Sequence, residues 1–423
     1  MHSQPALLRR LGLADAVFLG LGSMIGAGVF AAFAPAAAAA GTALLIGLAL
    51  AAIVAFCNAT ASAQLAAAHP TSGGTYAYGR AELGPWWGFV AGWCFVIGKL
   101  ASCAAMALTF AAYAAPPGWE RPVAVVAVAA LAAVNYFGIT RTALLTRIIV
   151  VFVLMTLAVV VAAGIDAEGI PDVWRGVQLL RTDAVDAGAY GILQSAGLLF
   201  FAFAGYARIA TLGEEVRDPR RTIPRAIVLS LGIAVGVYGV IALTVLATLG
   251  PAGTAVSLAP LADTAASPGW PWAEPLVRVG AAAASLGALL ALIAGIGRTS
   301  LAMAREDDLP RYFAAVHPRW RVPHRAEVAV ALLVIAAVLL VDLRGAIAFS
   351  SFGVLIYYFI ANVAAWRQAA RARLYPRALQ ALGAAGCVAL VVTLPTLGVI
   401  VGALVVLVGI GYRAIRLWAQ ARR

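Results

Sequence analysis

Charge is scarce in this chain, and lysine is almost absent. Only 11% of its 423 residues are charged, whereas 63% are hydrophobic, and Lys99 is the single lysine among 30 basic residues. A chain of this composition cannot fold as one water-soluble domain. The near-complete use of arginine, together with abundant alanine, is typical of a GC-rich bacterial genome. We therefore expect a protein of a bacterial cell membrane.

Cysteine and histidine are also rare, with four of each. The cysteines all fall inside apolar segments and lack the spacing of a metal site, which favours small buried hydrophobic residues. Gly98-Lys99 falls short of a phosphate-binding loop, because Leu100 stands where Ser or Thr would coordinate magnesium. The sequence therefore predicts no enzyme active site, no metal, no cofactor and no use of ATP.

Long apolar runs dominate the rest of the sequence. The hydrocarbon core of a bilayer is about 30 Å thick and needs roughly 20 apolar residues per spanning helix. Twelve segments are candidates, the ninth and eleventh being short. They run near residues 13–40, 42–68, 86–114, 121–137, 143–165, 190–212, 224–250, 276–303, 327–342, 345–366, 379–394 and 397–418. No stretch between them suits a separate soluble domain, so residues 1–423 are predicted to form one transmembrane domain.

The net charge of +12 is unevenly distributed along the chain. If the N-terminus is placed inside the cell, 22 basic residues fall in inner loops and five in outer loops. Such a bias is typical of cytoplasmic loops. We therefore expect both termini in the cytoplasm and the lipid bilayer, rather than nucleic acid, as the partner of this basic chain.

Glycine interrupts two of the apolar segments. Segment 13–40 contains Gly22, Gly26 and Gly28, and the sixth segment is disturbed around Gly205. Backbone that leaves a helix inside a bilayer is tolerated only where it is buried in protein or lines a water-filled cavity. Broken helices at matching places in two halves of a chain point to the substrate site of a transporter. Plain helix packing through a small-xxx-small pattern is the alternative.

An unwound first helix would suit an anionic ligand. Its free N–H groups would face the ligand, and the half-helix starting near Ala27 would add the positive end of its dipole. The carboxylate of a free amino acid fits such a site.

Four motifs, in order, resemble the amino acid–polyamine–organocation family of permeases. They are Gly22-Ser-Met-Ile-Gly-Ala-Gly-Val-Phe30, His69-Pro-Thr-Ser-Gly-Gly-Thr-Tyr76, Phe200-Phe-Ala-Phe-Ala-Gly-Tyr206 with the loop Glu214-Glu-Val-Arg-Asp-Pro219, and Leu301-Ala-Met-Ala-Arg-Glu-Asp-Asp-Leu-Pro310. The resemblance implies the all-α leucine-transporter-type fold, with about 12 transmembrane helices of which helices 1 and 6 are unwound. Residues 13–165 and 190–366 would form a 5+5 inverted repeat, followed by two additional helices at 379–418.

The same resemblance implies a substrate site. Backbone N–H groups of the first break would meet the carboxylate of the substrate, and carbonyls of both breaks would meet its α-amino group. The residues concerned are Gly26, Ala27 and Gly28 for the carboxylate, and Met24, Phe201, Ala202 and Ala204 for the amino group. Ser23 and Gly205 complete the expected site. The ring of Phe201 or Phe203 would cover it, with plain packing as the alternative for either ring.

The chain departs from the family at the residue that couples transport to an ion. Many relatives carry a lysine midway along helix 5, where this sequence places Val153, and residues 288–292 of helix 8 lack the paired hydroxyls that suit sodium. Lys99 lies deep in helix 3, where a charged residue is a functional candidate by default. We hypothesise that it replaces the missing lysine, meets carbonyls exposed by the helix-1 break and couples transport to protons. A permanent cationic strut or a neutral buried amine is the alternative.

Residues after the second break are candidates for a gate or for selectivity. Glu214 or Glu215 would pair with a nearby arginine as a cytoplasmic latch, unless these charges only form a solvated loop. Arg208 would border the inner vestibule and repel cationic substrates, unless its side chain only snorkels to the membrane interface.

The expected function is secondary active transport of an amino acid by alternating access, either proton-coupled or by exchange. No carboxylate lies within a helix core to balance a buried cation, which favours a neutral amino acid. A cationic amino acid or polyamine antiporter is the alternative. A channel or a membrane-embedded receptor would be a different class, and no polar ring typical of a channel is visible.

Overall fold

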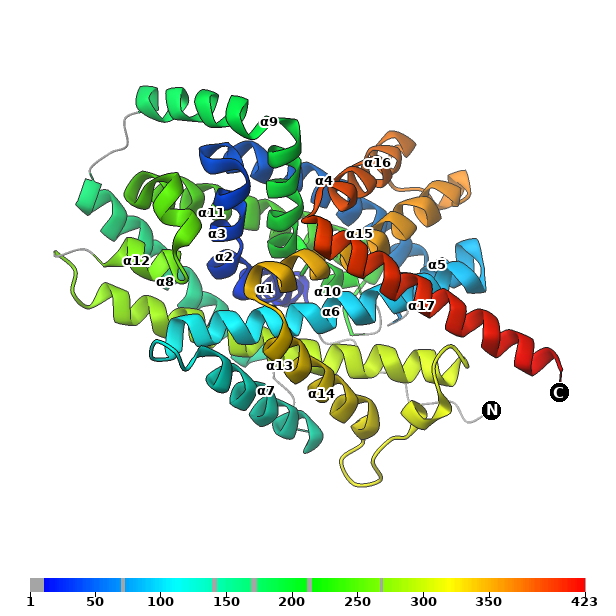
Figure 1. Ribbon diagram of the computed structural model, residues 1–423. Coiled ribbons are helices and arrows are strands. Elements are labelled where there is room, and N and C mark those ends of the chain that lie inside the picture. The colour runs from blue at the N-terminus through cyan, green and yellow to red at the C-terminus, as the bar shows by residue number, and fades with distance from the viewer. Residues whose placement is uncertain are drawn as a thin grey trace.

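The described chain is almost entirely helical. The computed structural model describes residues 11–69, 73–138, 143–168, 173–210, 215–266 and 269–422. Its helices, shown in Figure 1, are α1 (Leu13–Met24), α2 (Ala27–Ala31), α3 (Phe33–Ala40), η1 (Gly41–Ala43), α4 (Leu44–Ala68), α5 (Gly74–Leu83), α6 (Pro85–Ala114), α7 (Glu120–Tyr136), α8 (Ala143–Glu168), α9 (Val173–Phe203), α10 (Ala207–Ala210), α11 (Pro219–Val256), α12 (Pro260–Ala265), α13 (Ala273–Arg305), η2 (Arg311–Ala314), α14 (His324–Leu340), α15 (Leu343–Arg367), η3 (Ala370–Ala372), α16 (Arg377–Thr393) and α17 (Thr396–Ala421).

Among the described residues, nine helical stretches are long and apolar enough to cross a membrane. They are Leu13–Ala31, Phe33–Ala68, Pro85–Ala114, Leu144–Asp166, Leu180–Phe203, Pro219–Val256, Ala273–Arg305, Leu343–Arg367 and Thr396–Ala421. The all-helical, many-spanning architecture expected from hydropathy is thus confirmed. Three further predicted segments form α7, α14 and α16, of 17 residues each. At 1.5 Å per residue each measures about 25 Å, less than the hydrocarbon core, so the full number of twelve spans stays a prediction.

The helix that carries the second break begins well before the predicted residue 190. α9 starts at Val173 and passes through a bend at Gly188, whose φ of 61° is in the left-handed region. Hydropathy missed its first part because this part carries charged residues such as Arg181 and Asp183. The sequence therefore located the apolar half of α9 but not the polar arm that precedes it.

The arm of α9 is attached to the turn between α3 and α4. Asp183 accepts a hydrogen bond from the backbone N–H of Thr42 over 2.6 Å. Gly41, with a φ of 53°, leaves room for this carboxylate, because a Cβ there would lie 2.6 Å from Asp183 Oδ2. Beyond the bend, a Cβ on Gly191 would lie 2.7 Å from the carbonyl oxygen of Ala39. The C-terminal end of α3 and the middle of α9 are therefore packed backbone to backbone.

α6 occupies the centre of the helix assembly. It packs against α13 on one side and α15 on the other. At the contact with α15, a Cβ on Gly353 would lie 2.8 Å from the carbonyl oxygen of Cys94, and Ser102 and Ser350 share a hydrogen bond of 2.7 Å. Small residues that bring helices close and hydroxyls that bond across them are typical of membrane helix packing. The four cysteines are buried, as the sequence predicts.

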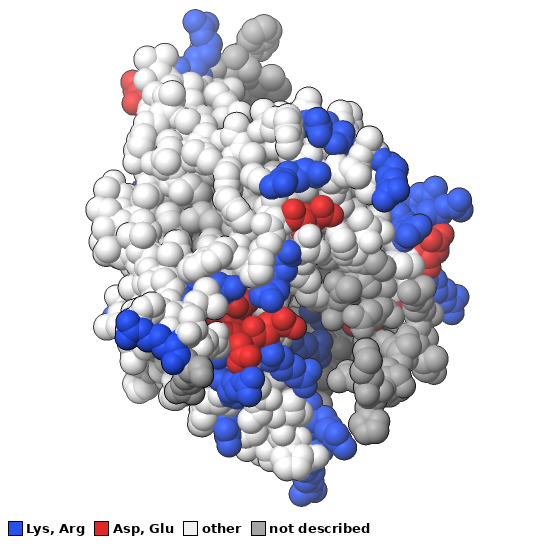
Figure 2. Space-filling view, turned by 90° about the vertical axis from the view of Figure 1, so that its right-hand side faces the viewer, with Lys and Arg blue, Asp and Glu red and all other residues white. Residues whose placement is uncertain are grey.

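α17 lies at the edge of the assembly. It packs on α15 and α6, and its C-terminal end projects from the body of the molecule in Figure 1. Figure 2 looks onto that end and shows a group of acidic side chains surrounded by lysine or arginine side chains, on a surface that is otherwise mostly uncharged. Other charged side chains are spread over the same face, and this group contains the largest gathering of acidic ones.

Candidate functional site

The first apolar helix is broken after Met24. α1 ends there, Ile25 and Gly26 leave the helix, and α2 begins at Ala27. α2 has only five residues, but the helical direction continues into α3, because Ala32 between them keeps right-handed helical angles. The leading N–H groups of α2 have no partner within their own helix. The backbone thus leaves the helix where the glycine pattern predicts.

The second break follows Phe203. The chain between α9 and α10 forms a tight turn in which N–H groups bond to carbonyls three residues back, as Arg208 does to Gly205 over 3.0 Å and Tyr206 does to Phe203 over 3.5 Å. Such a turn directs carbonyls away from the helix ladder. The carbonyls of Ala202 and Ala204 instead receive side-chain donors.

The two breaks touch each other through their backbones. A Cβ on Gly28 would lie 2.6 Å from Cα of Ala202, and a Cβ on Gly205 would lie 2.2 Å from the carbonyl oxygen of Ser23. Real Cβ atoms do not approach backbone so closely, so only glycine fits at either position. Close backbone packing is therefore one role of Gly28 and Gly205.

One tyrosine connects the two breaks. The hydroxyl of Tyr238, from α11, lies 2.7 Å from the carbonyl oxygen of Met24 and 3.0 Å from that of Ala202. A hydroxyl has a single proton, so it cannot fully satisfy both oxygens at once. A second donor, such as the ammonium group of a ligand, would be favoured at this point.

Lys99 reaches the second break, not the first. Its Nζ donates a hydrogen bond of 3.3 Å to the carbonyl oxygen of Ala204, which also accepts one of 3.4 Å from the hydroxyl of Tyr358. The expectation that Lys99 donates to carbonyls of the helix-1 break is therefore wrong. Its acceptor lies in the second break, because the face of α6 that carries Lys99 is turned toward the end of α9. Its depth in the protein is as expected, since the residue is only 7% exposed.

The two candidate aromatic covers occupy different surroundings. Phe203 packs its ring 5.1 Å from the ring of Tyr238 and is fully buried. Phe201 lies in an apolar cluster that includes Ala288, Leu289 and Ile293 of α13. Both rings pack in the protein core, and whether either covers a substrate stays a prediction.

A small cavity adjoins the first break. Its volume is about 10 Å³, and its lining residues are Gly22, Ile25, Gly26, Ile149, Val150, Val153 and Ala284. Such a space holds about one water molecule and is too small for an amino acid. This cavity alone therefore cannot hold a substrate. Val153, where the family resemblance implied a lysine, contributes an apolar wall.

The gate candidates are only partly described. Glu214 lies outside the described residues. The carbonyl of Glu215 accepts the N–H of Leu11 over 3.1 Å, so the backbone at this position holds the segment before α1. Arg208 has Arg298 and Glu215 as charged neighbours. The latch and selectivity roles stay predictions.

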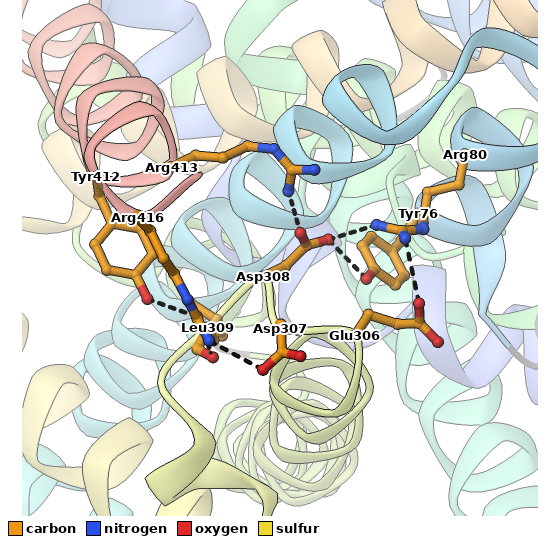
Figure 3. Close-up of polar contacts among 9 residues, drawn as sticks. All are labelled: Tyr76, Arg80, Glu306, Asp307, Asp308, Leu309, Tyr412, Arg413 and Arg416. Atoms are coloured by element: carbon orange, nitrogen blue, oxygen red, sulfur yellow. Dashed lines mark hydrogen bonds and ion pairs between the residues drawn. The ribbon is translucent and has the colours of Figure 1, made fainter. Parts of the chain in front are cut away.

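A cluster of charges at the end of α13 was not predicted from the sequence. Figure 3 shows that Arg413 and Arg416 from α17 approach it from one side, and Tyr76 and Arg80 from α5 approach from the other. Asp308, the central acid, is bonded by Arg413, by Arg80 over 2.9 Å and by the hydroxyl of Tyr76 over 2.8 Å. We call the residues drawn in Figure 3 the Asp308 cluster.

Burial separates the two aspartates of this cluster. The side chain of Asp308 is 4% exposed and that of Arg413 is 8% exposed. Burial and the bond to Asp308 raise the pKa of Tyr76, which keeps its phenol protonated as a donor. Asp307 is 35% exposed and pairs with Arg416 over 3.1 Å, and a hydrogen bond from Arg311 lowers its pKa. The acidic run before Pro310 and the arginines of an otherwise apolar α17 were the available sequence signals.

The chain is similar in sequence to known transporters. The sequence profile of a family described as amino acid permease matches residues 11–416. An uncharacterized transporter of Mycobacterium tuberculosis is 56% identical over 410 residues, which cover 97% of this chain and 92% of that protein. Human cationic amino acid transporter 4 is 29% identical over 384 residues, covering 85% and 60%. A branched-chain amino acid permease of Bacillus subtilis is 25% identical over 347 residues, covering 76% and 73%.

The difference in burial between the two aspartates gives a paired test. Asp308→Asn should lower the free energy of unfolding by about 3 kcal/mol, because it removes the charge opposite the buried Arg413. Asp307→Asn should have little effect, because water screens exposed ion pairs. Denaturant titration in detergent micelles measures both variants. Equal losses in the two would contradict the central position of Asp308.

Proposed function

Since this chain belongs to the amino acid permease family, a family of transporters and not of enzymes, we propose that it carries a neutral amino acid across the cell membrane by alternating access. The observation that supports this most strongly is the contact between two helix breaks deep within a protein of many membrane spans. Broken helices of this kind form the substrate sites of many secondary transporters.

The proposed architecture is the leucine-transporter-type fold in one domain. Residues 13–165 and 190–366 form the two inverted repeats, α7, α14 and α16 complete twelve spans, and 379–418 add two helices outside the repeat. Both termini are proposed to be cytoplasmic, which the distribution of arginine supports. Labelling of a cysteine introduced at Arg422 by an impermeant reagent in intact cells would contradict this orientation.

The two ends of the substrate are proposed to bind to different backbone groups. The N–H groups of Gly26, Ala27 and Gly28 receive the carboxylate, with Ser23 beside them. The carbonyls of Met24, Phe201, Ala202 and Ala204, next to Gly205, receive the ammonium. The hydroxyl of Tyr238 has one proton for the two carbonyl oxygens of Met24 and Ala202. A substrate ammonium would supply the second donor, which supports this arrangement.

The surroundings of the proposed site favour an uncharged side chain. Phe201, Ala288 and Ile293 belong to one apolar cluster beside the second break. A cationic substrate would need a buried counter-charge. The relative from Bacillus subtilis is named for branched-chain amino acids, whereas the human relative is named for cationic ones. The second name keeps a cationic amino acid or polyamine antiporter as the alternative.

The transport proposal is tested with purified protein in liposomes preloaded with unlabelled leucine. Labelled L-leucine should accumulate by counterflow that saturates and that D-leucine inhibits far less than L-leucine. Labelled arginine should not accumulate. Saturable counterflow of arginine without leucine would favour the cationic alternative, and a nonsaturating flux would indicate a channel.

Gly26 separates substrate binding from helix packing. A Cβ at this position would lie 2.9 Å from Cβ of Ala288, so Gly26→Ala alone mixes the two effects. The additional change Ala288→Gly removes the clash. We expect the double variant to bind leucine at least about tenfold more weakly than Ala288→Gly alone, about 1.4 kcal/mol, because the new methyl group fills space needed by the carboxylate. Equal dissociation constants in the two would leave packing as the role of Gly26.

Arg208 is proposed to repel cationic substrates from the inner vestibule. Arg208→Gln should lower the concentration of arginine that inhibits leucine uptake about fivefold, the effect of about 1 kcal/mol of charge repulsion. Arg344→Gln, the same substitution at the start of α15, is the control and should leave inhibition unchanged. An unaltered inhibition profile in Arg208→Gln would show that the arginine has no part in selectivity.

A further inference from the structure

Three side chains of the protein donate hydrogen bonds to carbonyl oxygens that are proposed to bind the ammonium of the substrate. Tyr238 bonds those of Met24 and Ala202, while Lys99 and Tyr358 bond that of Ala204. The tyrosines offer hydroxyls. Lys99 offers the same chemical group as an amino acid, an ammonium on a tetrahedral carbon. It therefore imitates the substrate at this acceptor.

Lys99 has no carboxylate to hold its proton among the described residues. Cys103 faces it from one turn along α6. Tyr358 of α15 shares its acceptor, and the ring of Tyr206, from the second break, stacks 5.0 Å from that of Tyr358. Burial without a counter-ion disfavours the charged form of a lysine relative to its neutral amine. Its charge can therefore change during a transport cycle.

The carbonyl of Ala204 needs a donor whenever the site is closed. A buried carbonyl without a hydrogen bond loses its hydration without compensation, and no such loss arises while the site is open to water. In the described conformation, Lys99 and Tyr358 are the donors at this carbonyl. Closure is thus compatible with an ammonium at Ala204, whether it comes from the substrate or from the protein.

We propose that the ammonium of Lys99 and the ammonium of the substrate alternate on the carbonyl of Ala204, so that the carrier exchanges one proton for one amino acid. This rests on the proposed function. When an amino acid binds, Lys99 leaves the carbonyl and releases its proton to water on that side of the membrane. When the amino acid departs on the other side, Lys99 takes a proton from water there and returns with it. Protons and amino acids then move in opposite directions.

Binding measurements at different pH test the competition directly. As the pH rises through the range where Lys99 is protonated, the dissociation constant of leucine should fall about tenfold per pH unit. Leucine and the proton of Lys99 compete for one site, and each therefore weakens the binding of the other to the same extent. Lys99→Met should bind leucine with a constant that does not vary with pH. Wild-type binding that weakens as pH rises, or that is independent of pH, would overturn the proposal.

Proton movement supplies an independent readout. In liposomes that contain a pH-sensitive dye, entry of leucine should make the lumen more alkaline at a ratio of one proton per leucine. Acidification of the lumen on entry of leucine would show that protons and leucine move in the same direction, and it would overturn the proposal. Lys99→Met should keep exchange of leucine for leucine but lose proton movement and net transport, because its empty site has no ammonium for the return step.

Two further variants make these tests specific. Ser102→Ala removes a hydrogen bond between α6 and α15 one turn from Lys99 without changing charge, and it should keep the pH dependence. Lys99→Gln retains a neutral donor and replaces Lys99→Met if the latter does not fold. Its binding should also be independent of pH, and a wild-type pH profile in it would contradict the proposal. Absence of saturable leucine exchange in wild-type protein at every pH would instead refute the proposed function.

Discussion

The contact between two stretches of bare backbone determines how the centre of this protein is built. Gly28 lies against Ala202 and Gly205 lies against Ser23, at distances that exclude any side chain. If the breaks were farther apart, the hydroxyl of Tyr238 could not reach carbonyls of both. The hydrogen bonds of the site therefore depend on the absence of two methyl groups, and glycine serves packing and polar chemistry at the same time.

Charge is used in two different ways in this molecule. At the centre, neutral hydroxyls supply most of the donors, and Lys99 is the exception. At the end of α13, three acids and several arginines are concentrated around Asp308 and connect α5, α13 and α17. α17 otherwise contributes apolar surface such as Leu404 and Leu407, which is exposed on the described chain. Its two arginines therefore give a peripheral helix a defined position.

The sequence predicted what depends on local pattern. Apolar length located the helices, and glycine spacing located both breaks. It did not predict contacts that depend on which face a helix turns inward, so Lys99 was assigned to the wrong break. Asp308 and Arg413 lie in distant parts of the chain, so the acidic run before Pro310 and the arginines of α17 are visible in the sequence but their pairing is not. The first part of α9 was not predicted, because its charged residues lower the mean hydropathy of that segment.

The attachment of Asp183 to Thr42, together with the packing of Gly191 on Ala39, has a mechanical consequence. The half of the first broken helix that follows its break and the half of the second that precedes its break are held together at residues distant from both breaks. A rotation of either half about its break would therefore displace the other half through these contacts. Movement of one half without the other would break the bond of Asp183 to Thr42 and separate Gly191 from Ala39.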